Sequence, residues 1–219
     1  MSNAQTFNNT VKQVEEYHGG ITEDVSFHGE TKFGSSDDYV QFDKNGNVSM
    51  NGDATVWDDL VVPLTSSRVG ALSKPDFDYT NLGYLFPKND ADEILYFIAQ
   101  LPHRYKEGST IYPHLHWQQA ADLAAVFKLD YKWFNIGAAV PESFTTYAMD
   151  AYAVTYSSGS IHQISHGGDG IAGTGKGISS LLLCKLYRDD NVYTGDALAF
   201  QFDVHFEIDA AGSREEYIK

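Results

Sequence analysis

The segment from Leu198 to Ile208 alternates apolar and polar residues. Side chains of a β-strand point to its two faces in turn, so a period of two over this length predicts a strand with one face in a core. That face must pack against a second apolar layer, which makes a layered β fold the strongest expectation. The expected inner face is Leu198, Phe200, Phe202, Val204, Phe206 and Ile208, and the expected outer face is Ala199, Gln201, Asp203, His205 and Glu207.

Several other segments have the same alternation, and no comparably clear helix occurs among them. We therefore predict that residues 73–219 form an all-β domain, an antiparallel β-sandwich of the jelly-roll kind. The predicted strands are Leu95–Leu101, Ile111–Trp117, Phe127–Trp133, Met149–Tyr156, Ile178–Tyr187 and Leu198–Ile208, with Trp57–Val62 as a possible extra one. The predicted core positions are Phe97, Leu115, Tyr131, Trp133, Phe200, Phe202, Val204 and Phe206.

The first 72 residues have a different character. Residues 25–72 contain the pairs Asn45-Gly46 and Asn51-Gly52 between short alternating stretches, which predicts a meander, or stem, of very short strands. Residues 1–24 are polar, and we expect them to form an extended anchoring arm that is ordered by a partner surface. The few large apolar side chains of the arm are the predicted partner-binding residues: Phe7, Val11, Val14, Tyr17 and Ile21.

The charge of the chain excludes some classes of partner. Its 15 basic and 30 acidic residues give a net charge of −15 at pH 7, so we expect neither nucleic acid nor an anionic membrane surface as a partner. No apolar run approaches the roughly 18 residues that a membrane-spanning helix needs. The N-terminus lacks the basic region and apolar core of a secretory signal.

Residues Gly108 to His116 have the spacing G-x5-H-x-H, which resembles the first metal-binding motif of cupins. His114 and His116 would share one face of a strand, as metal ligands require. The resemblance ends there, because Gln118 and Gln119 follow where a carboxylate is expected and no second motif surrounds His205. The alternative is that both histidines are held by hydrogen bonds on a polar or interface face. We expect the chain to need no metal or other cofactor. If it does bind a metal, His114 and His116 are the candidate ligands.

Other catalytic motifs are incomplete. The glycine-rich stretch from Gly170 to Gly177 lacks the hydroxyl residue that follows the lysine of a phosphate-binding loop. No Gly-x-Ser-x-Gly elbow is present. The single cysteine, Cys184, lies in an apolar run and is predicted to be a buried core residue. We therefore expect no enzymatic activity.

The succession of several short strings of residues points to a family. They are Val56-Trp57-Asp58-Asp59-Leu60, Leu101-Pro102-His103, Lys106-Glu107-Gly108, Pro113-His114-Leu115-His116-Trp117, Ile178-Ser179-Ser180-Leu181-Leu182, Leu186-Tyr187-Arg188-Asp189, Phe202 to Asp209 and Gly212-Ser213-Arg214. Together they resemble a group of tailed-bacteriophage proteins encoded among virion structural genes. The resemblance covers about Val56 to Lys219, and the first 55 residues are similar only to the repetitive stems of phage fibres.

The resemblance implies a non-enzymatic virion component, assembled in the host cytoplasm as a homotrimer and attached by its N-terminal arm to capsid, portal, neck or tail proteins. Capsid decoration, neck and fibre attachment are the roles it suggests. A different metal site for His114 and His116 is an alternative, since in trimeric phage spikes an H-x-H from each chain can bind a shared iron on the three-fold axis. It requires that the strand of His114 and His116 lies on such an axis. The alternatives are a receptor- or glycan-binding fibre tip and a cupin-like metal-dependent enzyme.

Overall fold

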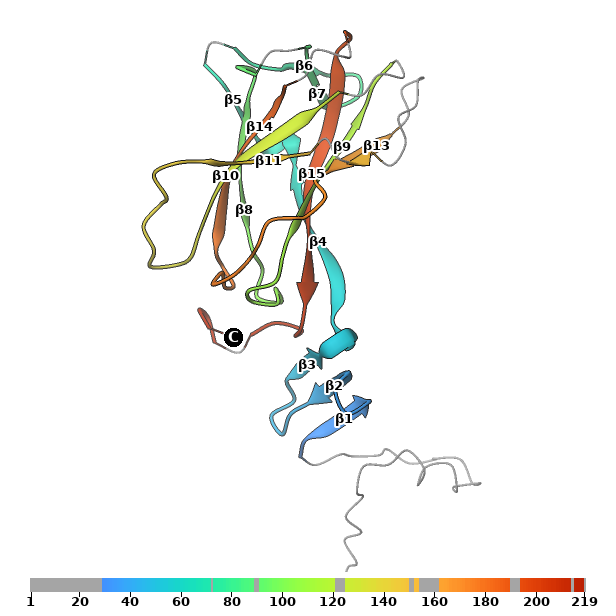
Figure 1. The fold of residues 1–219 in the computed structure, drawn as a ribbon, viewed down its shortest axis with the longest axis vertical. Coiled ribbons are helices and arrows are strands. Elements are labelled where there is room, and N and C mark those ends of the chain that lie inside the picture. Colours follow the sequence, from blue (N-terminus) through green and yellow to red (C-terminus); the bar gives the residue numbers. More distant parts are fainter. Residues whose placement is uncertain are drawn as a thin grey trace, which may run out of the picture.

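The computed structural model describes residues 29–71, 73–88, 91–120, 125–149, 152–153, 162–189, 194–213 and 215–218. The predicted anchoring arm, with Phe7, Val11, Val14, Tyr17 and Ile21, lies outside the described residues. Within them, a small three-stranded sheet lies at one end of the molecule and two larger sheets lie at the other (Figure 1). We call the small sheet and the turn that follows it, residues 31–54, the stem, and the two larger sheets the head.

The stem is an antiparallel meander. Its strands are β1 (Thr31–Gly34), β2 (Tyr39–Phe42) and β3 (Val48–Asn51), in the order β1-β2-β3. Gly46, with φ +81°, supplies the left-handed residue that the turn between β2 and β3 requires. No residue of these strands is buried, so the stem strands have no core of their own.

The second Asn-Gly pair has a different role from the first. Asn51-Gly52 does not close a hairpin; Gly52 opens the 3₁₀ turn η2 (Gly52–Ala54), which leads out of the stem into the head. Gly52 has φ +56°, and a Cβ there would lie only 2.1 Å from Asp38 Oδ1. Glycine is therefore required by both conformation and space at this junction.

The head contains a five-stranded and a seven-stranded sheet, and all the described strand pairs in them are antiparallel. The five-stranded sheet has the order β11-β10-β14-β8-β5. The seven-stranded sheet has the order β12-β13-β9-β15-β7-β6, and β4 also pairs with β15. The strands of the first sheet are β5 (Arg68–Val69), β8 (Leu95–Gln100), β10 (Phe127–Phe134), β11 (Thr145–Ala148) and β14 (Leu181–Arg188). Those of the second are β4 (Val56–Pro63), β6 (Asp76–Asp78), β7 (Gly83–Phe86), β9 (Tyr112–Gln118), β12 (Tyr152–Ala153), β13 (Gln163–His166) and β15 (Ala197–Ile208). A short 3₁₀ turn, η3 (Leu64–Ser66), links β4 to β5.

The two sheets pack face to face around one hydrophobic core. The ring of Phe97 on β8 lies 4.8 Å from that of Phe202 on β15. The ring of Phe127 on β10 lies 5.6 Å from Phe86 on β7 and 5.5 Å from Trp117 on β9. The predicted all-β antiparallel sandwich is confirmed. Most strands that are consecutive in the chain fall in opposite sheets, a connectivity compatible with the jelly-roll arrangement.

Most of the predicted core is buried, and one prediction fails because of a β-bulge. Phe97, Leu115, Trp133, Phe202, Val204 and Phe206 are buried, whereas Tyr131 and Phe200 are only partly buried. In β15, Ala199 is opposite Trp117 and Gln201 is opposite His116, so Phe200 is the extra residue of a bulge. The bulge reverses the alternation, and Ala197 and Ala199, rather than Leu198 and Phe200, face the core.

The bulge marks the point at which β15 changes neighbours. Before it, residues 197–199 of β15 pair with β7; after it, residues 201–208 pair with β4. The strand β4 thus belongs to the head, as does β5, although the predicted boundary assigned residues 25–72 to the meander and gave Trp57–Val62 only as a possible extra strand. In the structure the sandwich begins at Val56, because β4 completes the sheet beside β15.

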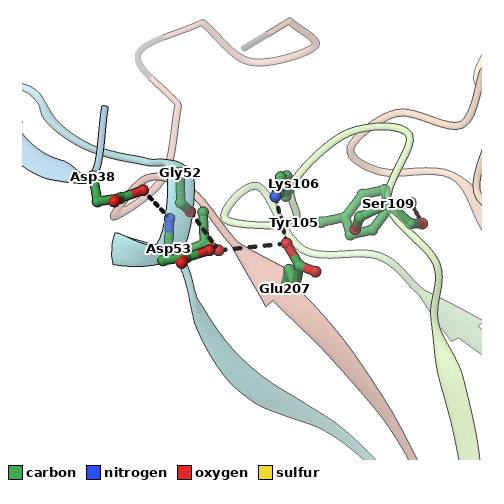
Figure 2. Close-up of polar contacts among 8 residues, drawn as sticks. Asp38, Gly52, Asp53, Tyr105, Lys106, Ser109 and Glu207 are labelled. Carbon is green, nitrogen blue, oxygen red and sulfur yellow. Dashed lines mark hydrogen bonds and ion pairs between the residues drawn. The ribbon is translucent and has the colours of Figure 1, made fainter. Parts of the chain in front are cut away.

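Figure 2 shows hydrogen bonds on both sides of the junction between the stem and the head. In the stem, the amide of Asp53 donates to Asp38 Oδ1 over 2.8 Å. In the head, Glu207 accepts hydrogen bonds from the Lys106 ammonium and from Thr55 Oγ1, the latter over 3.4 Å. Backbone bonds add to this joint, since the amide of Met50 donates to the carbonyl of Asp209 over 2.6 Å. The stem is therefore fixed to the head through polar contacts rather than through a shared core.

Candidate functional site

The outer face of the seven-stranded sheet holds a cluster of histidines and aspartates. Strand β9 places His114 and His116 on this face, while its inward residues Leu115 and Trp117 are fully buried in the core. On the neighbouring strand β15, Asp203 is directly opposite His114, and His205 follows two residues later on the same face. The H-x-H of β9 and the D-x-H of β15 thus lie side by side because both have the two-residue period of a strand.

Three polar atoms converge on His205 Nε2. His114 Nδ1 lies 3.1 Å away, Asp203 Oδ2 lies 3.1 Å away, and Asp59 Oδ1, from β4, lies 2.9 Å away. An imidazole nitrogen bears either one hydrogen or one lone pair, so it forms one conventional hydrogen bond at most. The remaining contacts at this atom are consequently left without a matching donor or acceptor.

Asp203 is an unusual residue for a sheet surface. It is only 3% exposed, because the surrounding side chains cover it. Its Oδ1 atom has no hydrogen bond among the described residues, although His116 Nε2 lies 3.3 Å from it. A buried carboxylate is costly unless a cation or hydrogen bonds compensate its charge. The compensation that Asp203 receives in the described part of the chain comes from His116 and His205.

Two more histidines from β13 and the segment before it extend the cluster. His166 is opposite His114 in the sheet, with ring centres 5.1 Å apart. His162 stacks on His116, and its Nε2 lies 2.8 Å from His116 Nδ1. The cluster thus contains five of the eight histidines of the chain: His114, His116, His162, His166 and His205.

The crowding affects protonation. Burial, followed by the nearby His205, lowers the pKa of His114 to about 4, from an ordinary value of 6.5. His114 is therefore a neutral imidazole at pH 7. In this state one of its ring nitrogens has a free lone pair, which is the form that accepts a proton or a metal ion.

Part of the cluster has the residue types that can bind a cation. The atoms His114 Nδ1 or Nε2, His205 Nδ1 or Nε2 and a carboxylate oxygen of Asp203 provide three ligand atoms within 4.8 Å of one another. Two imidazoles and one carboxylate form a donor set that borderline transition metals accept. Of the two histidines singled out in the sequence, His114 belongs to this set, whereas His116 contacts Asp203 from its other side.

The metal ligands predicted from the sequence did not include Asp203, His205, His162 or His166, and His205 was expected only on a polar face that meets solvent or another chain. A signal existed for the first two, since they alternate on the polar side of the most regular strand pattern in the chain. The pattern does not show which strand lies next to which. His114 and His205 are 91 positions apart in the sequence and meet only because β9 and β15 are neighbours in the sheet. The glycine-rich stretch does not contribute to the cluster; it packs its Gly173 against Ser109, and the strand β14 follows it. Cys184 is buried, as predicted, and its burial raises the pKa of the thiol.

Comparisons with protein-family models, with curated proteins and with solved structures gave no match. Among the described residues, no helix is long and apolar enough to cross a membrane.

Proposed function

We propose that the chain is a non-enzymatic structural component of a tailed-phage particle, a trimeric β-sandwich attached through its N-terminal region. The sequence resemblance between Val56 and Lys219 supports the phage assignment. One structural observation supports the building-block role: the edge strand β4 runs from the stem into the head and exposes large apolar side chains. Val56, Trp57 and Val61 are 46%, 56% and 48% exposed.

An exposed apolar edge is a template for association. Among the described strands, β4 pairs only with β15, so its other edge is not paired with any described strand. Charges and proline on an edge strand oppose such association, and β4 carries Asp58, Asp59 and Pro63. The proposal therefore depends on the exposed apolar side chains of β4 rather than on its backbone edge. The stem beside it exposes Phe33 at 54% and Phe42 at 42% and contains no buried residue in its strands. The exposed apolar side chains of β4 and of the stem would each be covered if copies of the chain associated through them.

The arrangement gives each end of the molecule a role. The stem and the arm that precedes it would face the particle, where capsid, portal, neck or tail proteins are the proposed partners. The head would point outward, where the net charge of −15 opposes aggregation. A decoration, neck or fibre-attachment role fits this orientation.

The experiment is a measurement of mass by light scattering on the purified chain and on two variants. The wild-type chain should have three times the mass of one chain. Trp57→Lys, on the β4 edge, should give the monomer with an unchanged β-type circular dichroism spectrum. Ile98→Lys is the matched control, because Ile98 is 60% exposed on β8 of the other sheet, and it should remain trimeric.

A monomeric wild-type chain at micromolar concentration would contradict the proposed trimer. The phage assignment has its own test, which is mass spectrometry of purified particles from a host that produces this chain. Deleting residues 1–24 should leave a folded head that is absent from those particles, and recovery of the shortened chain at the normal copy number would refute attachment through the arm.

A further inference from the structure

The structural role proposed above does not require the buried carboxylate and the converging imidazoles on the outer face of β9 and β15. Their arrangement remains to be explained. Asp203, at 3% exposure, is covered by histidines, and its Oδ1 atom is without a hydrogen bond in the described part of the chain. Two carboxylate oxygens and an imidazole nitrogen surround one atom of His205 at 2.9–3.1 Å.

We propose that His114, His205 and Asp203 bind one divalent transition-metal ion per chain, of the Zn²⁺ class. The ion would lie among His114 Nδ1, His205 Nε2 and Asp203 Oδ2, which approach one another from two paired strands. In a tetrahedral zinc site with bonds of about 2.0–2.1 Å, neighbouring ligand atoms are about 3.3 Å apart. The separations of 3.1 Å from His205 Nε2 to the other two atoms are close to this spacing.

The sheet makes the ligand set rigid. Asp203 and His114 are direct cross-strand partners, and His205 lies one pleat further along β15 on the same face. Neither strand has to move for the three side chains to meet, so the ordering cost of binding is limited to side-chain rotation. A bound cation would also satisfy the negative charge of Asp203, which hydrogen bonds alone do not do.

Neighbouring side chains would support the three ligands. Asp59 Oδ1, 2.9 Å from His205 Nε2, is placed to act as a fourth ligand or to hold a metal-bound water. His116 Nε2 faces the second oxygen of Asp203 at 3.3 Å, which would orient the carboxylate. Because Asp59 belongs to β4, the ion would join the proposed assembly edge to the centre of the sheet. The expected consequence is stabilisation of the folded chain by the metal, without any need for turnover.

The test uses the full chain after dialysis against EDTA, titrated with ZnCl₂ by calorimetry and with CoCl₂ by visible absorption. One equivalent of Zn²⁺ per chain should bind, Co²⁺ should give the absorption bands of a site with fewer than six ligands, and the Tm should rise with added Zn²⁺. His114→Gln and His205→Gln should each weaken Zn²⁺ binding by more than about 100-fold, beyond the range expected for outer partners. His116→Gln should weaken it by about 10–100-fold.

His103→Gln is the matched control. His103 lies outside the cluster, where its ring nitrogens contact Ser213 Oγ at 2.6 Å and Ser179 Oγ at 3.1 Å, so its loss should leave the affinity for Zn²⁺ unchanged. If Asp203→Asn fails to fold, the two histidine variants still decide the outcome. The proposal is overturned if the wild-type chain binds neither ion at micromolar concentration. It is equally overturned if His114→Gln and His205→Gln bind as tightly as the wild type, if only His116→Gln abolishes binding, or if one ion binds per three chains.

Discussion

The stem and the head are both antiparallel β structures, but they are held together in different ways. The head buries large side chains completely, among them Trp117, Phe127 and Phe202 at 0% exposure. The stem buries no strand residue and depends on turns, cross-strand pairs and the polar joint around Gly52 and Glu207. Two- or three-stranded sheets without a hydrophobic face against a neighbour are barely stable alone. The stem should consequently depend on the head, and on neighbouring copies, for its order.

The largest expected effect comes from opening the core of the head. Phe202→Ala should lower the free energy of unfolding by about 3–5 kcal/mol, because it removes a fully buried ring that packs on Phe97. Phe33→Ala is the comparison in the stem; Phe33 is 54% exposed, so its loss should cost less than about 1 kcal/mol. Urea unfolding followed by circular dichroism measures both. Equal costs for the two variants would show that the stem has a core of its own.

The sandwich itself was predictable because one face of a half-buried strand leaves a two-residue pattern. Leu115, Phe202 and Val204 were all placed correctly on that basis. The bulge at Phe200 was not predictable, since it exists where β15 exchanges β7 for β4, and no local pattern records a change of neighbour. The burial of Arg188 was not predictable either, because it depends on partners that only the fold brings together. Its guanidinium donates to the carbonyls of Phe86 and Gly195.

The candidate site was predictable only in part, for a related reason. His114 and His116 were found because they are close in the sequence. Asp203 and His205 belong to the same cluster only because β9 and β15 are adjacent, which is a property of the topology. The burial of Asp203 is likewise a tertiary effect, because a polar residue on the outer face of a strand is normally expected to meet water.

The joint between the two regions gives the second prediction. Gly52→Ala should destabilise the stem by more than about 1 kcal/mol, because Ala is disfavoured at φ +56° and its Cβ would also meet Asp38 and the Asp37 carbonyl. Gly46→Ala is the matched control, since Gly46 has φ +81° but no atom within 4 Å of the added Cβ. Limited proteolysis of the stem, with the head as internal reference, measures the difference. Identical cleavage rates for the two variants would mean that the close approach at Gly52 is unimportant.

The third prediction is that low pH lowers the stability of the head through a group that the stem strands do not contain. The pKa of His114 in the folded head, about 4, lies below its ordinary value of 6.5, so the unfolded state binds more protons between these values. The stability that this shift represents is fully present above pH 6.5 and is lost as the pH falls toward 4. The groups that face His114 are His205, Asp203, His166 and His116. The stem strands contain no histidine, so this effect belongs to the head.

The measurement is the Tm of the head between pH 7 and pH 4.5, with EDTA present to exclude metal ions. The wild-type Tm should fall as the pH decreases, and His114→Gln should make the fall less steep, because the variant removes the group that is kept neutral in the folded state. An equally steep fall in the variant would assign the acid sensitivity to other groups.

The smallest expected effect is at the ion pair that closes the joint. Lys106 donates to Glu207, and Thr55 donates to the same carboxylate oxygen, so Glu207 links the chain leaving the stem to a loop of the head. Both charged side chains are partly exposed, at 38% and 27%, and water weakens such a pair. Lys106→Met should therefore cost at most about 1 kcal/mol of head stability. The stem should become easier to cleave, because the Glu207 carboxylate that accepts from Thr55 is no longer held in place by the Lys106 ammonium. The head is affected less, because the backbone bond from the Lys106 amide to the Glu207 carbonyl remains. The test is the rate of stem proteolysis in Lys106→Met. The control is Lys32→Met, which breaks the exposed ion pair with Glu30. Faster cleavage only in the Lys32 variant would contradict the expectation.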